Sequence, residues 1–381
     1  MIRCFLLLFW VAFLAPLVFC APAGAEGDRP SASKQKKAKK AKERNVNRAA
    51  AQKRRELREM GVKNAQVKRP ANWPRHVTVP KDVEVQEVPA PAGQGGFVFE
   101  SNHFRYLSPL KLDPTAQKTV SRLCECTYAA NRAIADVLPV VRSKAAGNGK
   151  KFNIVLAANM DAYHQAGGPQ GSAGVFFGQM MRRGNAPLQE SDIVRDQVLI
   201  PFQSLGLGQS GLVEREDIDT HALVHELTHQ QFLLNNLPIW ANEGWAEYVG
   251  YVPYVGETLD FDRGFSLILH AAKQRSDHGA LDFSFSLEEF LSIDQGTLYG
   301  FMRQGKDTYM LSTMLISFFV HLDSKRGPDA LKKYLQALVD GQPAEEATQL
   351  LIEPYRSVER LEQQFIRAWK SKKVKASFSG K

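Results

Sequence analysis

The sequence predicts an α+β protein, in which a mixed α/β N-terminal part with a small sheet is followed by a mainly helical part. Two patterns support this prediction. Residues 97–215 contain short apolar runs bounded by Gly, Pro and charged residues, as strands do, whereas residues after Asp217 repeat apolar side chains at helical spacing. The composition, with 44% hydrophobic and 23% charged residues among 381, supplies enough apolar material for a sizeable core.

Residues 97–215 are expected to contain several short strands and one long helix. Asp113 is a residue type favoured at helix N-caps, and the apolar spacing after it predicts a helix that reaches about Val137. The predicted strands are Phe97–Glu100, Phe104–Tyr106, Phe152–Leu156, Gly174–Phe177 and Gln197–Phe202.

The C-terminal half is expected to be helical, with a break at Asn235–Pro238 between its first two helices. The predicted helices cover residues 219–235, 240–250, 262–275, 307–324, 327–340 and 356–371.

Residues 1–25 have the pattern of a signal peptide. Arg3 precedes an apolar run from Phe5 to Cys20, and Ala23–Ala25 resembles a cleavage site. An uncleaved anchor is the alternative, but the run of about 16 residues is shorter than the ~20 that span a bilayer. We expect a secreted, periplasmic or cell-envelope protein without a transmembrane segment after signal cleavage.

Residues 26–96 are expected to form a basic, disordered arm and, from residue 71, a Pro/Gly-rich linker. Residues 26–90 carry 18 Lys and Arg against 8 Asp and Glu, so the net charge of +9 originates there and residues 91–381 are nearly neutral. Such a run is usually only solvated. The alternative is a tether, through residues 34–69, to an anionic envelope polymer. The neutral remainder argues against a specific nucleic-acid partner.

Two cysteines remain after signal cleavage, Cys124 and Cys126. Residues two apart on a helix point to different sides, so a strain-free local disulfide is not expected. A metal site would need further ligands, and none stands nearby in the sequence. Two buried thiols are the simpler interpretation.

The segment HELTHQ carries the main chemical motif. His225 and His229 lie one turn apart on one helix face, so both imidazoles can reach one ion. Zinc accepts such nitrogen ligands and leaves a position for water in catalytic sites. Glu226 can take a proton from that water, whose pKa falls to about 7 on zinc. The alternative is a helix with two ordinary, partly buried histidines.

A second helix is expected to supply the third ligand. Glu243 and Glu247 are again four apart and face one side of that helix. One carboxylate can bind the metal, while the other accepts a hydrogen bond from a ligand histidine and fixes its tautomer. Gly244 allows close helix approach. A solvated acidic face is the alternative, and the three aromatic residues in the same segment argue against it.

HELTHQ followed by NEGWAEY resembles the gluzincin metallopeptidases, which include thermolysin-like and aminopeptidase-N-like enzymes. The resemblance implies that His225, His229 and Glu243 bind Zn²⁺, that Glu226 is the general base and that Glu247 supports a ligand histidine. It covers about 100 residues. It also implies a metallopeptidase-like domain at 97–375, with an α/β part at 97–215 and a helical zinc-binding part at 216–375.

In aminopeptidase-N-like enzymes a tyrosine that opens a later helix contacts the transition state, and Tyr309 falls in a similar place. Its phenol can donate a hydrogen bond to an oxyanion. A helix-packing role is the alternative, and Tyr299 is the competing tyrosine. His221, one turn before His225, is expected to start the helix or to lie near the substrate.

The chain departs from the aminopeptidase-N-like pattern because it has no Gly-x-Met-Glu-Asn segment, so an exopeptidase of that type is not expected. Over residues 95–340, the segments SNHFRYLSP, GGPQGSAGVFF and VLIPFQSLGL resemble an uncharacterised family of secreted bacterial proteins. In gluzincins an edge strand before the motif helix binds extended peptide, and Val198–Leu205 is the candidate by position.

The sequence therefore predicts a secreted zinc metallopeptidase, an endopeptidase that hydrolyses peptides or proteins by Glu-assisted attack of zinc-bound water. An inactive zinc-containing binding module in the cell envelope, tethered by the basic arm, is the first alternative. An envelope-binding protein whose main work is done by that arm is the second.

Overall fold

The computed structural model divides the chain into two units, Met1–Arg54 and Arg55–Lys381, and every described residue lies in the second. The described residues are 70, 72–79, 83–90, 95–139, 151–180, 193–208, 210–213, 220–232, 237–255, 257–275, 280–303 and 307–379. The predicted signal peptide and basic arm, at 1–25 and 34–69, lie outside these residues. No helix within the described part is long and apolar enough to cross a membrane.

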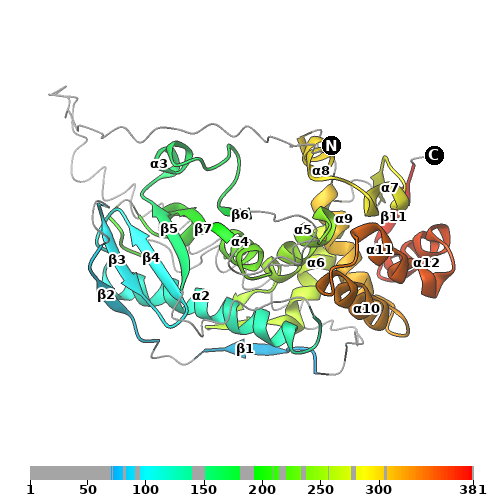
Figure 1. The fold of residues 1–381 in the computed structure, drawn as a ribbon, viewed down its shortest axis with the longest axis horizontal. Coiled ribbons are helices and arrows are strands. Elements are labelled where there is room, and N and C mark those ends of the chain that lie inside the picture. The colour runs from blue at the N-terminus through cyan, green and yellow to red at the C-terminus, as the bar shows by residue number, and fades with distance from the viewer. Residues whose placement is uncertain are drawn as a thin grey trace, which may run out of the picture. The chain divides into compact units, whose positions relative to one another are not determined.

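The fold is α+β, as the sequence predicts, with a sheet at one end of the described unit and a group of helices at the other (Figure 1). The sheet has six strands in the order β2-β3-β4-β5-β7-β6, and β4, β5 and β7 are parallel. Its strands are β2 (Gln86–Val88), β3 (Phe97–Glu100), β4 (Phe104–Ser108), β5 (Phe152–Ala157), β6 (Val175–Met180) and β7 (Ile193–Pro201).

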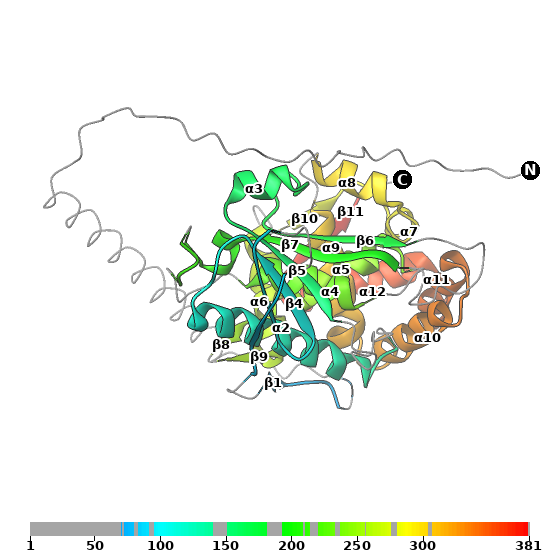
Figure 2. The ribbon, with the colours of Figure 1, turned by 60° about the vertical axis from the view of Figure 1, so that its left-hand side comes forward.

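Alternate residues of the central strands face two different layers. In β7, Val198 and Ile200 join the main core, whereas Leu199 joins a smaller cluster with Tyr163. Tyr163 belongs to α3 (Met160–Gln165), which lies across the sheet from α2 (Pro114–Ala135) and α4 (His221–Gln231) (Figure 2). Helix α3 therefore covers part of this second face beside β7, whereas Arg105 of β4 and Asn153 of β5 are exposed on it.

Helix α2 begins where the sequence predicts. The Asp113 carboxylate accepts hydrogen bonds from the backbone N–H groups of Thr115 and Ala116. Both cysteines lie on α2 as buried free thiols, which confirms the prediction. The buried Glu125 on the same helix accepts hydrogen bonds from Ser101 and His103 and so ties the β3–β4 turn to α2.

The helical part packs around α5 (Ile239–Gly250) and α9 (Thr308–Ser317), and α9 continues as a π-helical turn, η5 (Phe318–Leu322). Short 3₁₀ turns occur at η3 (Phe202–Leu205) and η6 (Glu353–Tyr355). The other helices are α6 (Phe261–Arg275), α7 (Leu287–Leu291), α8 (Gln295–Arg303), α10 (Gly327–Val339), α11 (Ala344–Ile352) and α12 (Val358–Ser371). Of these, α7, α8 and α11 were not expected from the sequence.

Strands also form where a linker was expected. Besides β2, the segment contains β1 (His76–Thr78), which pairs with β9 (Thr258–Asp260), and β9 pairs with β8 (Tyr254–Val255). The nearby Trp73 is 5% exposed and donates a hydrogen bond to the Tyr248 hydroxyl. A further pair, β10 (Ala280–Phe283) and β11 (Lys375–Phe378), is parallel.

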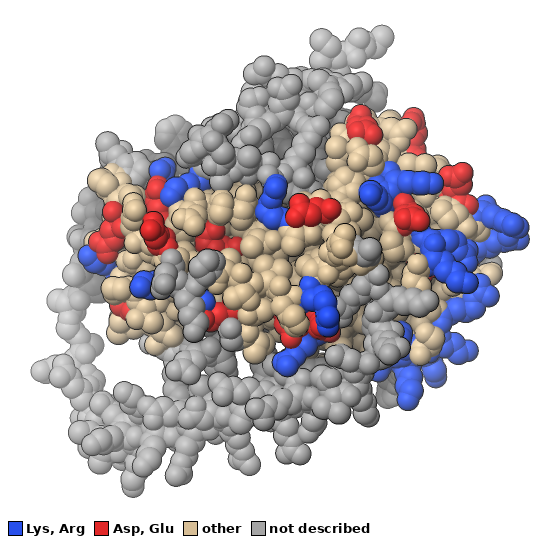
Figure 3. Space-filling view, turned by 90° about the horizontal axis from the view of Figure 1, so that it is seen from below, with Lys and Arg blue, Asp and Glu red and all other residues tan. Residues whose placement is uncertain are grey.

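Basic side chains gather at one end of the face seen in Figure 3, and acidic and basic side chains alternate over the rest. Seven Lys and Arg residues lie between residues 356 and 375, over α12 and β11, against two Glu residues in the same stretch. The nearly neutral folded part therefore has a basic C-terminal end.

Candidate metal centre

Helix α4 holds two histidines of the motif in contact with each other. Nε2 of His229 lies 3.0 Å from Nε2 of His225, one helical turn away. Leu223, Val224 and Leu227 fix the opposite side of the helix in the core, where each is at most 1% exposed. The amphipathic pattern of the helix therefore turns both imidazoles toward the same point.

Helix α5 brings Glu243 to that point. Its Oε2 lies 3.4 Å from Nε2 of His225 and 3.3 Å from Nε2 of His229. The segment between α4 and α5 falls in part outside the described residues, but both helices are placed and pack against each other. Two predicted ligands on one helix and one on the next therefore converge.

The spacing of these atoms fits a tetrahedral ion. Ligands about 2.0–2.2 Å from zinc in tetrahedral directions lie about 3.3–3.6 Å from one another. The three observed separations are 3.0, 3.3 and 3.4 Å. Within the described part of the chain, Oε2 of Glu243 accepts no hydrogen bond although it is buried. A metal ion would give this oxygen the bonding partner that no hydrogen bond provides, so the cluster can hold one.

The electrostatics of the cluster keep its carboxylate ionised. Burial alone raises the pKa of Glu243, but the adjacent His229 and His225 lower that pKa well below its usual range. Burial lowers the pKa of His225, while Glu243 and Glu247 raise it well above its usual value. The charged form of Glu243 is the form that binds a metal.

Glu247 lies behind the cluster, on the same face of α5 as Glu243. Its Oε1 is 3.2 Å from Nδ1 of His225 and 3.3 Å from Nε2 of His221. The contact with Nδ1 leaves Nε2 of His225 directed at the other two ligand atoms. His221, His225 and Glu247 also form a second group that could hold an ion, and it shares His225 with the first.

The carboxylate of Glu226 contacts the sheet. Its Oε2 accepts a hydrogen bond of 2.7 Å from the backbone N–H of Phe176 in β6. A Cβ atom at Gly174 would stand 3.2 Å from Cγ of Glu226, so glycine leaves room for the carboxylate beside the strand. Glu226 therefore sits between the helix that carries the histidines and one strand of the sheet.

That strand, β6, is the last strand of the sheet among the described residues. The predicted edge segment Val198–Leu205 is wrong, because β7 pairs with β5 on one side and with β6 on the other. Backbone groups used on both sides cannot pair with a further strand. Among the described strands, the one beside Glu226 that pairs on one side only is β6.

Both candidate tyrosines reach the site. The hydroxyl of Tyr299, on α8, donates a hydrogen bond of 3.1 Å to Oε1 of Glu243. The ring of Tyr309, on α9, lies edge-on to the ring of His225 with 6.2 Å between centroids. Burial, with Glu243 nearby, raises the pKa of both phenols above their usual value. Both therefore stay protonated and can donate hydrogen bonds at neutral pH.

Gly244 allows a close approach, but its partner is α9. A Cβ atom there would lie 2.7 Å from the backbone oxygen of Ser312 and 2.9 Å from Ile316. The approach brings α9, and with it Tyr309, up to the helix that carries Glu243.

Two contributors were not identified from the sequence, the Phe176 N–H and the space at Gly174. Their position beside Glu226 depends on strand pairing between distant segments.

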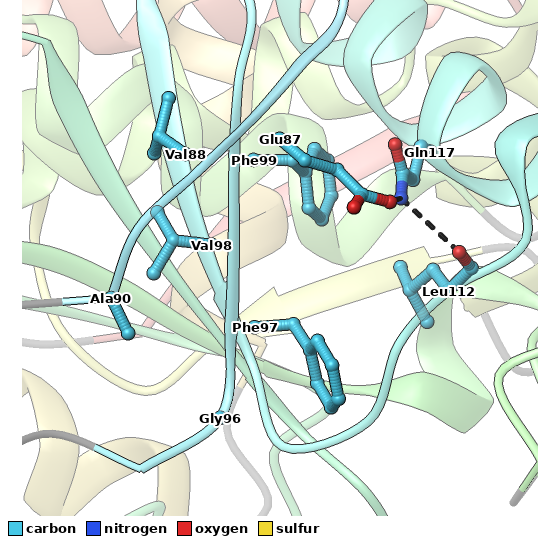
Figure 4. Close-up of a pocket in the computed structure, with 9 residues that line it drawn as sticks. All are labelled: Glu87, Val88, Ala90, Gly96, Phe97, Val98, Phe99, Leu112 and Gln117. Carbon is cyan, nitrogen blue, oxygen red and sulfur yellow. Dashed lines mark hydrogen bonds between the residues drawn. The ribbon is translucent and has the colours of Figure 1, made fainter.

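A separate pocket of about 180 Å³ lies between β2, β3 and the start of α2 (Figure 4). There the Gln117 side chain donates a hydrogen bond to the Leu112 carbonyl. This pocket shares no residue with the metal centre.

Comparison of the chain with protein-family models, with curated proteins and with solved structures finds no match.

Proposed function

We propose that this protein is a zinc-dependent endopeptidase of gluzincin type that acts outside the cytoplasm. The observation that carries the proposal is the convergence of His225, His229 and Glu243 within 3.4 Å of one another, beside a fourth polar residue, Glu226, that takes no part in the cluster. Two imidazole nitrogens and one carboxylate oxygen are the donor set of zinc peptidases.

Zinc bound by these residues would supply a Lewis acid and would lower the pKa of a water at the open position. Glu226 is our candidate to take the proton from the water. It follows His225 directly, and among the described residues only its Oε2 accepts a hydrogen bond, from Phe176. As the C–N bond breaks, the same carboxyl group can deliver the proton to the nitrogen of the leaving amine.

Negative charge develops on the substrate carbonyl oxygen when water attacks. A hydrogen-bond donor aimed at that oxygen stabilises the transition state. The described residues offer no partner for the Tyr309 hydroxyl, whereas the Tyr299 hydroxyl already donates to Glu243. Tyr309 is therefore the better candidate for this donor, and Tyr299 fixes the orientation of a metal ligand.

An extended peptide can bind along the edge of β6 through main-chain hydrogen bonds. This mode reads the backbone of the substrate and not its termini, which suits an endopeptidase. It also places the scissile bond near Glu226, because Phe176 of β6 contacts that carboxylate.

The location outside the cytoplasm rests on the signal-peptide pattern of residues 1–25. A tether to an anionic envelope polymer through residues 34–69 is consistent with such a location. Deletion of the arm separates the two roles, because a tether predicts loss of envelope association with retained turnover.

Metal removal and restoration test the proposal. The purified chain is stripped with a chelator and supplied with Zn²⁺, or with Mg²⁺ as the control, and cleavage of a denatured protein is followed. We expect one zinc per chain and cleavage only after Zn²⁺ is restored. Bound zinc without cleavage of a broad peptide library would favour the binding module, and failure to bind zinc would contradict the proposal.

A further inference from the structure

We propose that His221 is a positioning residue of the metal centre, which acts by holding Glu247 against His225. This inference rests on the proposed zinc site and extends it to a residue that contacts neither the ion nor the water. It assigns a function to the third histidine of α4, which the metal cluster itself does not use.

One oxygen atom joins the two histidines. Oε1 of Glu247 lies 3.3 Å from Nε2 of His221 and 3.2 Å from Nδ1 of His225. The histidines stand one helical turn apart on α4, with 6.2 Å between ring centroids and 28° between ring planes. A single carboxylate oxygen of Glu247 therefore lies between two histidines of the neighbouring helix.

The ring of His221 is itself fixed by the end of α5. The ring of Tyr251 packs edge-on against it, with 4.9 Å between centroids. A Cβ atom at Gly250 would stand 3.1 Å from Cε1 of His221, which is tighter than nine in ten real Cβ contacts. The missing side chain at Gly250 therefore lets the imidazole lie flat on the helix and reach Glu247.

Glu247 needs this second donor because it is buried, with a side chain only 11% exposed. A buried carboxylate is destabilising unless hydrogen-bond donors lie against it, and His221 and His225 are the two groups that contact Oε1. Without His221, only His225 would contact the carboxylate, and the Glu247 side chain could rotate toward another donor. The orientation of His225, and with it the angle of its Nε2 toward the ion, would then be less well defined.

A ligand role for His221 makes a different prediction. His221, His225 and Glu247 can also surround an ion, but His225 would then bind it through Nδ1. A chain that used both groups would bind two ions. The positioning role predicts one ion, bound more weakly when the donor of His221 is lost.

Four variants of the full mature chain test this inference: His221→Gln, His221→Phe, Glu247→Ala and the double variant His221→Phe/Glu247→Ala. Glutamine places an amide N–H near the position of Nε2, whereas phenylalanine keeps the ring and loses the donor. Zinc affinity is measured by competition with a chromogenic chelator, and Co²⁺ absorption spectra report the coordination geometry.

We expect His221→Phe to bind zinc about tenfold more weakly, with an altered Co²⁺ spectrum, and His221→Gln to restore most of the affinity. The double variant should bind no more weakly than Glu247→Ala, because His221 acts through Glu247. Gly250→Ala, which crowds the same imidazole, should weaken zinc binding less than His221→Phe does. It replaces His221→Phe in the test if that variant does not fold.

Unchanged zinc affinity in His221→Phe, additive losses in the double variant, or two ions per wild-type chain would overturn the inference. These outcomes differ from failure of the proposed function. Wild-type protein that binds no zinc would contradict the proposed function and the role of His221. Zinc binding without peptidase activity would contradict the proposed function alone, and the zinc affinities of the variants would still test the role of His221.

Discussion

The backbone N–H of Phe176 donates a hydrogen bond of 2.7 Å to Oε2 of Glu226, so the edge strand and the histidine-bearing helix meet at one carboxylate. In the proposed enzyme, the strand that aligns the peptide is the same strand that orients the general base. Changes to β6 should therefore alter turnover more than metal binding.

Substitution of Phe176 by proline removes this donor. Proline is tolerated in edge strands, where its missing N–H does not break the ladder. A hydrogen bond to a charged group contributes about 1.5–3 kcal/mol, so we expect kcat/KM to fall tenfold or more while zinc content stays at one per chain. Val198→Pro is the control: Val198 is the partner of Phe176 on the inner strand β7. This control should fail to fold, and equal loss of zinc in Phe176→Pro would contradict the account.

The two tyrosines should separate into different kinetic effects. Tyr309→Phe should lower kcat by about 10²–10³ with unchanged zinc affinity, since it removes a donor to the oxyanion. Tyr299→Phe should mainly weaken zinc binding, because Tyr299 bonds the ligand Glu243. Steady-state kinetics and chelator competition on both variants measure this. The reverse assignment of the two effects would show that Tyr299 is the catalytic tyrosine.

Gly244→Ala should destabilise the protein. The added methyl would meet the Ser312 carbonyl oxygen at 2.7 Å and force α5 and α9 apart, at a cost of about 1–3 kcal/mol. The matched control is Gly300→Ala on α8, where no described residue outside the local helix backbone comes within 4 Å of the added methyl. Alanine there should raise helix stability by up to about 1 kcal/mol. Urea unfolding of the metal-free proteins compares them, and similar midpoints would refute the close packing of α5 on α9.

Glu125 should give the fold a dependence on pH that is independent of the metal centre. Burial raises the pKa of Glu125, but hydrogen bonds from His103 and Ser101 bring it below its usual value. A carboxyl group with a lowered pKa stabilises the folded state above its unfolded pKa of about 4.3, and this contribution is lost as the pH falls through the folded pKa.

Glu125→Gln should therefore lower the unfolding free energy by about 1–3 kcal/mol above pH 5, and the difference from wild type should shrink below about pH 4. Metal-free protein is used, so that loss of zinc in acid does not contribute. Glu346→Gln, at an exposed position of α11, is the control and should stay within about 0.5 kcal/mol of wild type at each pH. A difference that grows in acid would contradict this assignment.

The parts of the site that could be predicted depend on local spacing. Residues four apart on a helix must share a face, so the sequence alone placed His225 with His229 and Glu243 with Glu247. The Asp113 cap likewise located the start of α2. These features need no knowledge of distant contacts.

The remaining features depend on pairing between distant segments. The three-residue strand β1 pairs with β9, about 180 positions away. It lies in a short Pro-rich segment whose sequence has no periodicity that would predict a strand. The edge strand was wrongly assigned to Val198–Leu205 from its chain position, because the strand in this segment is the end of β7, which lies between β5 and β6. A usable signal was present, because the continuous apolar run Val198–Ile200 is typical of a strand buried on both faces and not of an edge.

The central claim is that Glu226 is the proton acceptor at a zinc site that it does not help to form. Zinc content and cleavage of a denatured protein, measured side by side for the purified mature chain and for Glu226→Gln, test it most directly. The account predicts one zinc in both proteins and a rate lower by about 10²–10⁴ in the variant. Loss of zinc in Glu226→Gln, or undiminished cleavage by a variant that retains zinc, would contradict it.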